Sequence, residues 1–110
     1  MEHISAQDLR AFMVGKTLHA FDPDSGERVA SVTYMADGAC VARFVDGIED
    51  RGQYGLSGDT YWTKYTDFRA GQISEFYLVE VADQVAQAYH TDGRRAYLQS
   101  PLIELEEGAA

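Results

Sequence analysis

The residue types best suited to recognition chemistry lie near the C-terminal end of the chain: Tyr77, His90, Arg95 and Tyr97. With tight turns between three neighbouring strands, Tyr77 lies beside His90, and His90 lies opposite Arg95. In the same register Tyr97 lies opposite Ala88, so all four side chains share one face. Phenol, imidazole and guanidinium groups donate hydrogen bonds and suit an anionic or carbonyl-bearing ligand. The hypothesis depends on register, because a slip of one residue turns each side chain to the other face.

A second group of aromatic residues lies between positions 52 and 65. This stretch predicts a β-hairpin with Gly58-Asp59 as its two-residue loop. The cross-strand pairs expected from that loop are Ser57–Thr60, Leu56–Tyr61 and Tyr54–Thr63. The residues that form one apolar surface in this register are Tyr54, Leu56, Tyr61 and Tyr65. Trp62 then lies on the opposite face, where its ring covers Gly55.

Other reactive residue types give weaker patterns. No two histidines have the His-x-x-His or His-Glu-x-x-His spacing of a metal site, and we predict no catalytic residue, metal or cofactor. The segment 22–27 slightly resembles a calcium loop but lacks its distal Glu and glycine placement, so a surface turn is favoured. Cys40 is the single cysteine, which excludes an intrachain disulfide and predicts a buried, inert thiol rather than a nucleophile.

The charge balance limits the classes of partner. The 110 residues, expected to form a single domain over 1–110, include 18 acidic and 9 basic side chains, a net charge of −9. This field repels phosphate backbones, so nucleic-acid binding is not expected. The sequence starts without the basic and apolar segments of a signal peptide and has no apolar run of about 20 residues, so we expect a cytoplasmic protein without a membrane partner.

One helix is expected at the start of the chain, over residues 5–14. Ser5 is suited to cap it, and Leu9, Phe12 and Met13 form an apolar stripe at helical spacing. So short a helix is marginal by itself, and we expect it to dock on a sheet and cover the mouth of a barrel.

Short strands joined by tight turns make up most of the remaining sequence. They are expected at 16–21, 28–36, 39–45, 52–57, 60–65, 73–81, 85–90 and in a last segment that ends at 98. Asp37-Gly38 predicts a two-residue hairpin loop in which Met35 opposes Cys40. The pattern predicts an all-β, mainly antiparallel meander of about eight strands that closes into an up-and-down barrel, with a sandwich or an open curved sheet as alternatives. Residues 106–110 are expected to form a flexible tail.

Several short motifs, in this order and spacing, resemble a family of small uncharacterised bacterial lipocalin-like domains. They are Gly15-Lys16-Thr17, Tyr34-Met35-Ala36-Asp37-Gly38, Gly52-Gln53-Tyr54 and Gly58-Asp59-Thr60-Tyr61-Trp62. The resemblance covers roughly residues 5–100 and implies a calycin-type β-barrel. It implies no catalytic residue.

The leading functional hypothesis is non-catalytic binding of a small, partly apolar molecule inside the barrel. The residues expected to contact it are Tyr54, Tyr61, Tyr77, His90, Arg95 and Tyr97. One alternative is a protein-protein interaction or scaffold module that works as a homodimer through an exposed apolar face. Another is a small enzyme that uses His90 as an acid or base near Tyr77.

Overall fold

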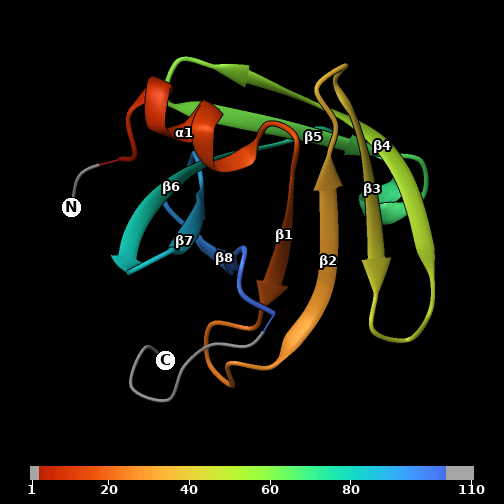
Figure 1. Cartoon of the computed structure of the whole chain (residues 1–110). Helices are drawn as coiled ribbons and strands as arrows, with labels where there is room; N and C mark the ends of the chain where they lie inside the picture. The colour runs from red at the N-terminus through yellow and green to blue at the C-terminus, as the bar shows by residue number, and fades with distance from the viewer. Residues whose placement is uncertain (1–2, 104–110) are drawn as a thin grey trace.

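The computed structural model describes residues 3–103 as one helix and a closed eight-stranded barrel (Figure 1). The elements are α1 (Ala6–Met13), β1 (Lys16–Phe21), β2 (Arg28–Tyr34), β3 (Ala39–Phe44), β4 (Glu49–Ser57), β5 (Thr60–Tyr65), the 3₁₀ turn η1 (Phe68–Gly71), β6 (Ser74–Ala82), β7 (Val85–His90) and β8 (Arg95–Ser100). Each strand pairs antiparallel with the next, and β8 pairs with β1 to close the barrel. The predicted up-and-down meander barrel is confirmed. The tail expected at 106–110 lies outside the described residues.

The hairpin of β4 and β5 has the predicted register. Leu56 pairs with Tyr61 and Tyr54 with Thr63 across the Gly58-Asp59 loop. Trp62 covers Gly55 as expected, because a Cβ atom added to Gly55 would lie 2.5 Å from the indole nitrogen. The predicted apolar surface is part of the main core, in which Tyr54 and Tyr61 are buried while Leu56 and Tyr65 pack against them.

Three loops with an Asp-Gly pair at their centre share one geometry. They span residues 35–39, 44–48 and 90–94, and in each the first amide donates to the carbonyl of the fifth residue at 2.8 Å. The glycines have φ between +93° and +94°, and each Asp Oδ1 accepts the amide two residues ahead at 3.0 Å. At Asp37-Gly38 and Asp92-Gly93 a three-residue loop with a left-handed glycine therefore replaces the predicted two-residue turn. The pairing of Met35 with Cys40 was wrong by one position, since Tyr34 pairs with Cys40.

The register around β7 also differs from the prediction. The β6–β7 loop is tight, with Ala82 opposite Val85, but a bulge shifts the pairs beyond it so that His90 lies opposite Phe76 rather than Tyr77. The longer loop before β8 places Arg95 opposite Tyr89 rather than His90. Further along these strands Ala86 pairs with Gln99 and Gln87 with Leu98, which is the register that the predicted pairing of Ala88 with Tyr97 implies, and the shift lies between Gln87 and Tyr89.

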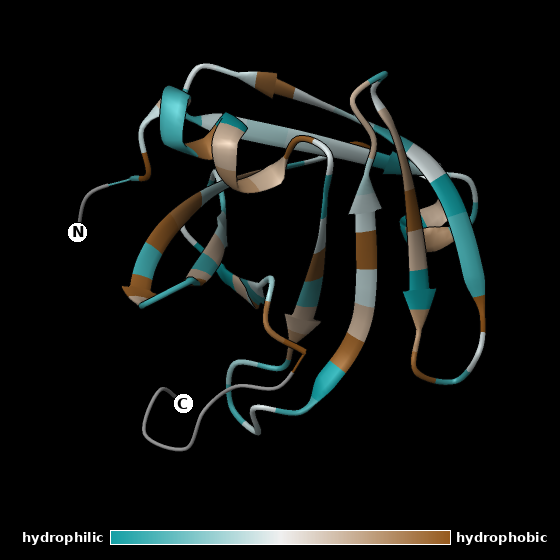
Figure 2. Cartoon of the chain, viewed as in Figure 1, coloured by the Kyte–Doolittle hydropathy of each residue, from teal (hydrophilic) through white to brown (hydrophobic). Residues whose placement is uncertain are grey.

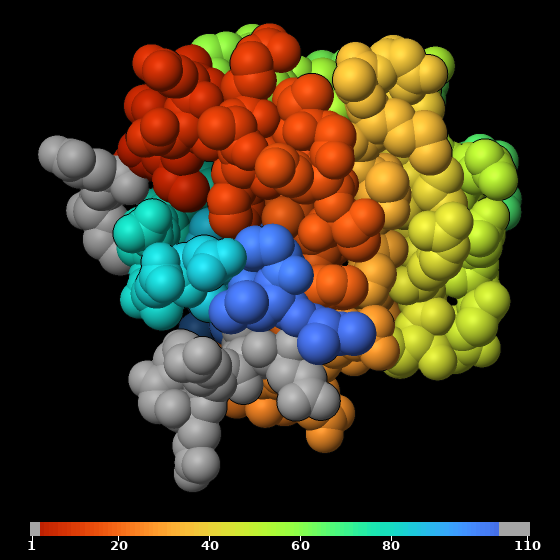
Figure 3. Space-filling view, viewed as in Figure 1, coloured from red at the N-terminus to blue at the C-terminus, as the bar shows by residue number. Residues whose placement is uncertain are grey.

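Helix α1 closes one end of the barrel, as the sequence predicted. Ser5 caps it by accepting the Asp8 amide at 3.3 Å, and Leu9 and Met13 are fully buried in the core. Figure 3 shows the helix packed directly over the start of β1. Apolar residues alternate with more polar ones along β2, which Figure 2 shows as changes of colour along one strand. No helix in residues 3–103 is long and apolar enough to cross a membrane.

Candidate functional site

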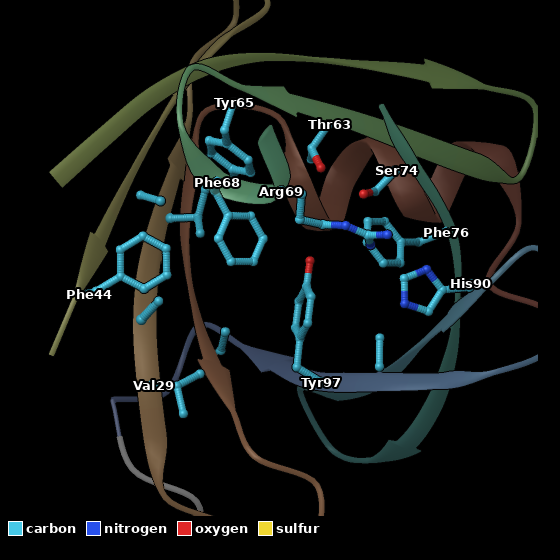
Figure 4. A pocket seen from close by; sticks show the side chains of 15 residues that line it. Val29, Phe44, Thr63, Tyr65, Phe68, Arg69, Ser74, Phe76, His90 and Tyr97 are labelled. Atoms are coloured by element: carbon cyan, nitrogen blue, oxygen red, sulfur yellow. The ribbon is translucent and has the colours of Figure 1, made fainter. Parts of the chain in front are cut away.

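The barrel contains a cavity of about 260 Å³ at the end away from α1 (Figure 4). Its lining residue on β1 is Ala20, which lies near the end of the strand that is farther from the helix. The residues that line the cavity are Ala20, Val29, Ala30, Val32, Ala42, Phe44, Thr63, Tyr65, Phe68, Arg69, Ser74, Phe76, His90, Ala96 and Tyr97. The small side chains of β1, β2 and β3 leave this space, because alanine fills less of a barrel interior than Leu or Phe.

Polar side chains gather on one side of this cavity. Thr63 and Ser74 are cross-strand neighbours on β5 and β6, both are buried, and neither hydroxyl forms a hydrogen bond with another described residue. Figure 4 shows both hydroxyls, the Arg69 guanidinium and the Tyr97 hydroxyl around the same space, with His90 beside them. The Thr63 and Ser74 hydroxyls can therefore bind an oxygen-bearing ligand without first breaking an internal hydrogen bond.

Aromatic side chains form the opposite side of the cavity. The ring centroids of Phe44 and Phe68 are 5.6 Å apart, and those of Tyr65 and Phe68 are 5.8 Å apart with their planes nearly perpendicular. Both geometries are favourable for aromatic pairs. Together with the alanines of the strands, these rings provide an apolar surface for the body of a small molecule.

The turn η1 carries Phe68 and Arg69 over the open end of the cavity. Asp50, a buried carboxylate of β4, holds this turn by accepting the amides of Asp67 at 3.2 Å and Phe68 at 2.8 Å. Arg69 and Ala70 both have left-handed backbone angles, with φ of 57° and 55°. Such angles cost energy for residues other than glycine and are found where the surroundings impose them, often at ligand sites.

A chain of buried hydrogen bonds forms the floor of the cavity. The Tyr34 hydroxyl donates to Gln99 Oε1 at 3.4 Å, and Gln99 Nε2 donates to the Tyr61 hydroxyl. The Tyr61 and Tyr97 hydroxyl oxygens are 3.3 Å apart. Tyr34, Tyr61 and Gln99 are almost completely buried, so this network fixes the position of the Tyr97 hydroxyl at the cavity wall.

Burial and neighbouring charges determine the protonation states of His90 and Tyr97. Burial lowers the pKa of His90 below its ordinary value, and the charges of Arg94 and Arg69 lower it further against the opposing effect of Asp92. Burial raises the pKa of the Tyr97 phenol. At neutral pH, Tyr97 is therefore a protonated donor and His90 a neutral imidazole, while Arg69 carries a positive charge.

Of the six predicted contact residues, three lie at the cavity, one lies in the core and two lie outside the barrel. His90 and Tyr97 line the cavity, and Tyr61 lies beneath it in contact with Tyr97. Tyr54 is a core residue whose hydroxyl donates to the Met35 carbonyl at 2.7 Å.

The other two predicted contact residues lie outside the barrel. Tyr77 stacks on His3 at 3.8 Å and on Tyr89 at 5.3 Å, and Arg95 forms an exposed ion pair with Asp24. The predicted face of four residues was thus wrong, because the bulge and the longer loop turned Tyr77 and Arg95 outward.

Three polar residues of the cavity were missed by the sequence interpretation: Thr63, Arg69 and Ser74. The inward direction of Thr63 follows from the predicted pair with Tyr54, so this signal was present in the sequence. Arg69 belongs to the connection between β5 and β6, and Ser74 is the first residue of β6 directly after it, where no local pattern indicates which side chains face inward.

Cys40 is buried, as predicted. Burial raises the pKa of its thiol to about 11, so the reactive thiolate is scarce at neutral pH. Within residues 3–103, no three His, Cys, Asp or Glu side chains are grouped in a way that could hold a metal ion.

Comparisons of the chain with models of protein families, with curated proteins and with solved structures found no match.

Proposed function

We propose that the protein is a non-catalytic binding protein that holds a small, partly apolar molecule in the cavity of its barrel, as a member of the lipocalin-like family that its motifs resemble. The observation that carries the proposal is a cavity of about 260 Å³ with aromatic rings on one side and uncommitted hydroxyls on the other. Ligand sites typically combine an apolar lining with a few polar groups that orient the ligand, and those for drug-sized molecules start at about 300 Å³. The ligand is therefore small.

Native mass spectrometry of freshly purified protein tests this proposal, together with two-dimensional NMR titrations with benzene, indole and hexan-1-ol. We expect a bound molecule in the mass spectrum, or saturable shifts of amides around the cavity. Ala42→Leu adds a larger side chain to the cavity wall and is expected to abolish binding, whereas Ala36→Leu, in an exposed loop, is the matched control. Absence of both a bound molecule and any saturable binding would refute the proposal.

The homodimeric interaction module is a second candidate, favoured by apolar side chains around the cavity mouth. Val45 and Ile48 are 63% and 60% exposed, and the Val45 amide donates to the carbonyl of Val29, which is also exposed. Together with the exposed Phe68 they form an apolar rim. Light scattering over a range of concentrations is expected to show a dimer that Val45→Lys dissociates, and a monomer at every concentration would refute this candidate.

A further inference from the structure

The cavity differs in charge from the rest of the molecule. The chain has twice as many acidic as basic side chains, yet the lining residues include Arg69 and His90 and no Asp or Glu. A bound carboxylate or other anion would therefore meet no like charge on the cavity wall, whereas a cation would meet Arg69. We infer that the ligand of this cavity is a small monoanionic carboxylic acid whose carboxylate lies among Arg69, Tyr97 and the hydroxyls of Thr63 and Ser74. This inference rests on the proposed binding function.

The buried hydrogen bonds leave one proton directed at the ligand. Gln99 Oε1 accepts from Tyr34, and Gln99 Nε2 donates to the Tyr61 oxygen. The Tyr61 proton is then available for its remaining neighbour, the Tyr97 oxygen at 3.3 Å. Once Tyr97 accepts that bond, its own proton is free to be donated into the cavity. The network thus presents Tyr97 as a donor, which is the role that a carboxylate requires.

The side chains of Thr63, Ser74 and Arg69 also favour a negatively charged ligand. The Thr63 and Ser74 hydroxyls have no partner among the described residues and can both donate. Arg69 is the single permanent cation among the lining residues, and no ion pair connects it to a described acidic residue. One cation balances one negative charge, and a dianion such as phosphate would leave an uncompensated charge in a partly buried site.

The position of the cation agrees with the shape of the cavity. Arg69 lies on η1 at the open end, and its exposure to water reduces the cost of desolvating a bound carboxylate. The apolar body of the acid would then lie against Phe44, Phe68 and the alanines of β2 and β3. A straight-chain or aromatic acid of a few carbons fits these dimensions.

Titrations with hexanoate and with its neutral isostere hexanamide test the inference. Both are followed by two-dimensional NMR of the purified protein at pH 7 and low salt. We expect hexanoate to bind about tenfold more tightly than hexanamide, the factor given by one charge-assisted contact, and to shift amides near Thr63, Arg69 and Ser74.

Variants separate the contributing groups. Arg69→Gln is expected to remove the preference for hexanoate without weakening hexanamide, and Tyr97→Phe to weaken hexanoate about three- to tenfold. Arg51→Gln is the matched control, because its side chain is 75% exposed on the outside of β4. Circular dichroism is used to check that each variant is folded. Arg69→Lys keeps the positive charge and is expected to retain part of the preference for hexanoate over hexanamide.

The outcomes distinguish this inference from the proposed function. Equal affinity for hexanoate and hexanamide, or an unchanged preference in Arg69→Gln, overturns the carboxylate assignment and leaves ligand binding in place. Absence of saturable binding by either molecule overturns the carboxylate assignment, and it refutes the binding function as well when benzene, indole and hexan-1-ol also fail to bind.

Discussion

Removing the Asp50 carboxylate is expected to release the turn that carries Phe68 and Arg69. Asp50 is 5% exposed, and its Oδ2 accepts the amides of Asp67 at 3.2 Å and Phe68 at 2.8 Å. A hydrogen bond to a charged group contributes about 1.5–3 kcal/mol, and two amides that share one oxygen give less than twice that value. We therefore expect Asp50→Ala to destabilise the turn by about 2–3 kcal/mol and Asp50→Asn, which keeps an acceptor, by about 1 kcal/mol.

The loss is expected to be local, because the turn can detach while the barrel strands remain paired. Amide hydrogen exchange measures it at Ala70 and Gln72, whose amides donate to carbonyls within the turn at 2.9 and 3.0 Å. Their exchange should accelerate about 30- to 150-fold in Asp50→Ala, while the free energy of global unfolding in denaturant falls by less.

The neighbouring exposed carboxylate provides the control. Glu49→Gln changes a charge on the same strand without touching the turn, and it should leave exchange at Ala70 and Gln72 unchanged. If these amides exchange at the same rate in Asp50→Ala as in the unsubstituted protein, Asp50 does not anchor the turn. Hexanoate binding should weaken in parallel with the loss of protection, because Arg69 is then no longer held at the cavity.

Three further predictions concern stability, pH and reactivity. Gly52→Ala should lower the free energy of unfolding in denaturant by about 2–3 kcal/mol, because the added Cβ would meet the backbone of Lys64. Gly55→Ala should lower it by under about 1 kcal/mol, because its Cβ would meet the side-chain ring of Trp62, which can move. Equal losses in the two variants would contradict this prediction. The pKa of His90 is lowered in the folded state, so the unfolded state binds more protons and the free energy of unfolding should fall as the pH decreases below about 6.5. His90→Gln should reduce that fall when unfolding is measured as a function of pH. An unchanged slope would contradict this prediction. The Cys40 thiol, with a pKa raised from 9.0 to about 11, should react with an aromatic disulfide reagent at pH 8 about 100-fold more slowly in the folded protein than in denaturant, and equal rates would show that it is accessible.

Much of the architecture was determined by local sequence. The bounds of β1, β5 and β7 and the register of the β4–β5 hairpin agree with the prediction. Each depends on interactions between residues close in sequence, namely a turn with fixed geometry and a two-residue alternation of apolar side chains. A series of short strands joined by tight turns leaves two unpaired edge strands unless the sheet closes into a barrel. Here the sheet closes through the pairing of β1 with β8.

The site was decided mainly by tertiary structure. A bulge in β6 and one extra loop residue before β8 are small local changes, but each moves the register by one position and turns Tyr77 and Arg95 to the outside. Arg69 lies at the cavity on a turn whose amides at Asp67 and Phe68 donate to Asp50, a residue distant in sequence. Sequence alone therefore determined that aromatic and polar residues lie on a closed sheet. Which of them meet around one cavity depended on long-range contacts that no local pattern encodes.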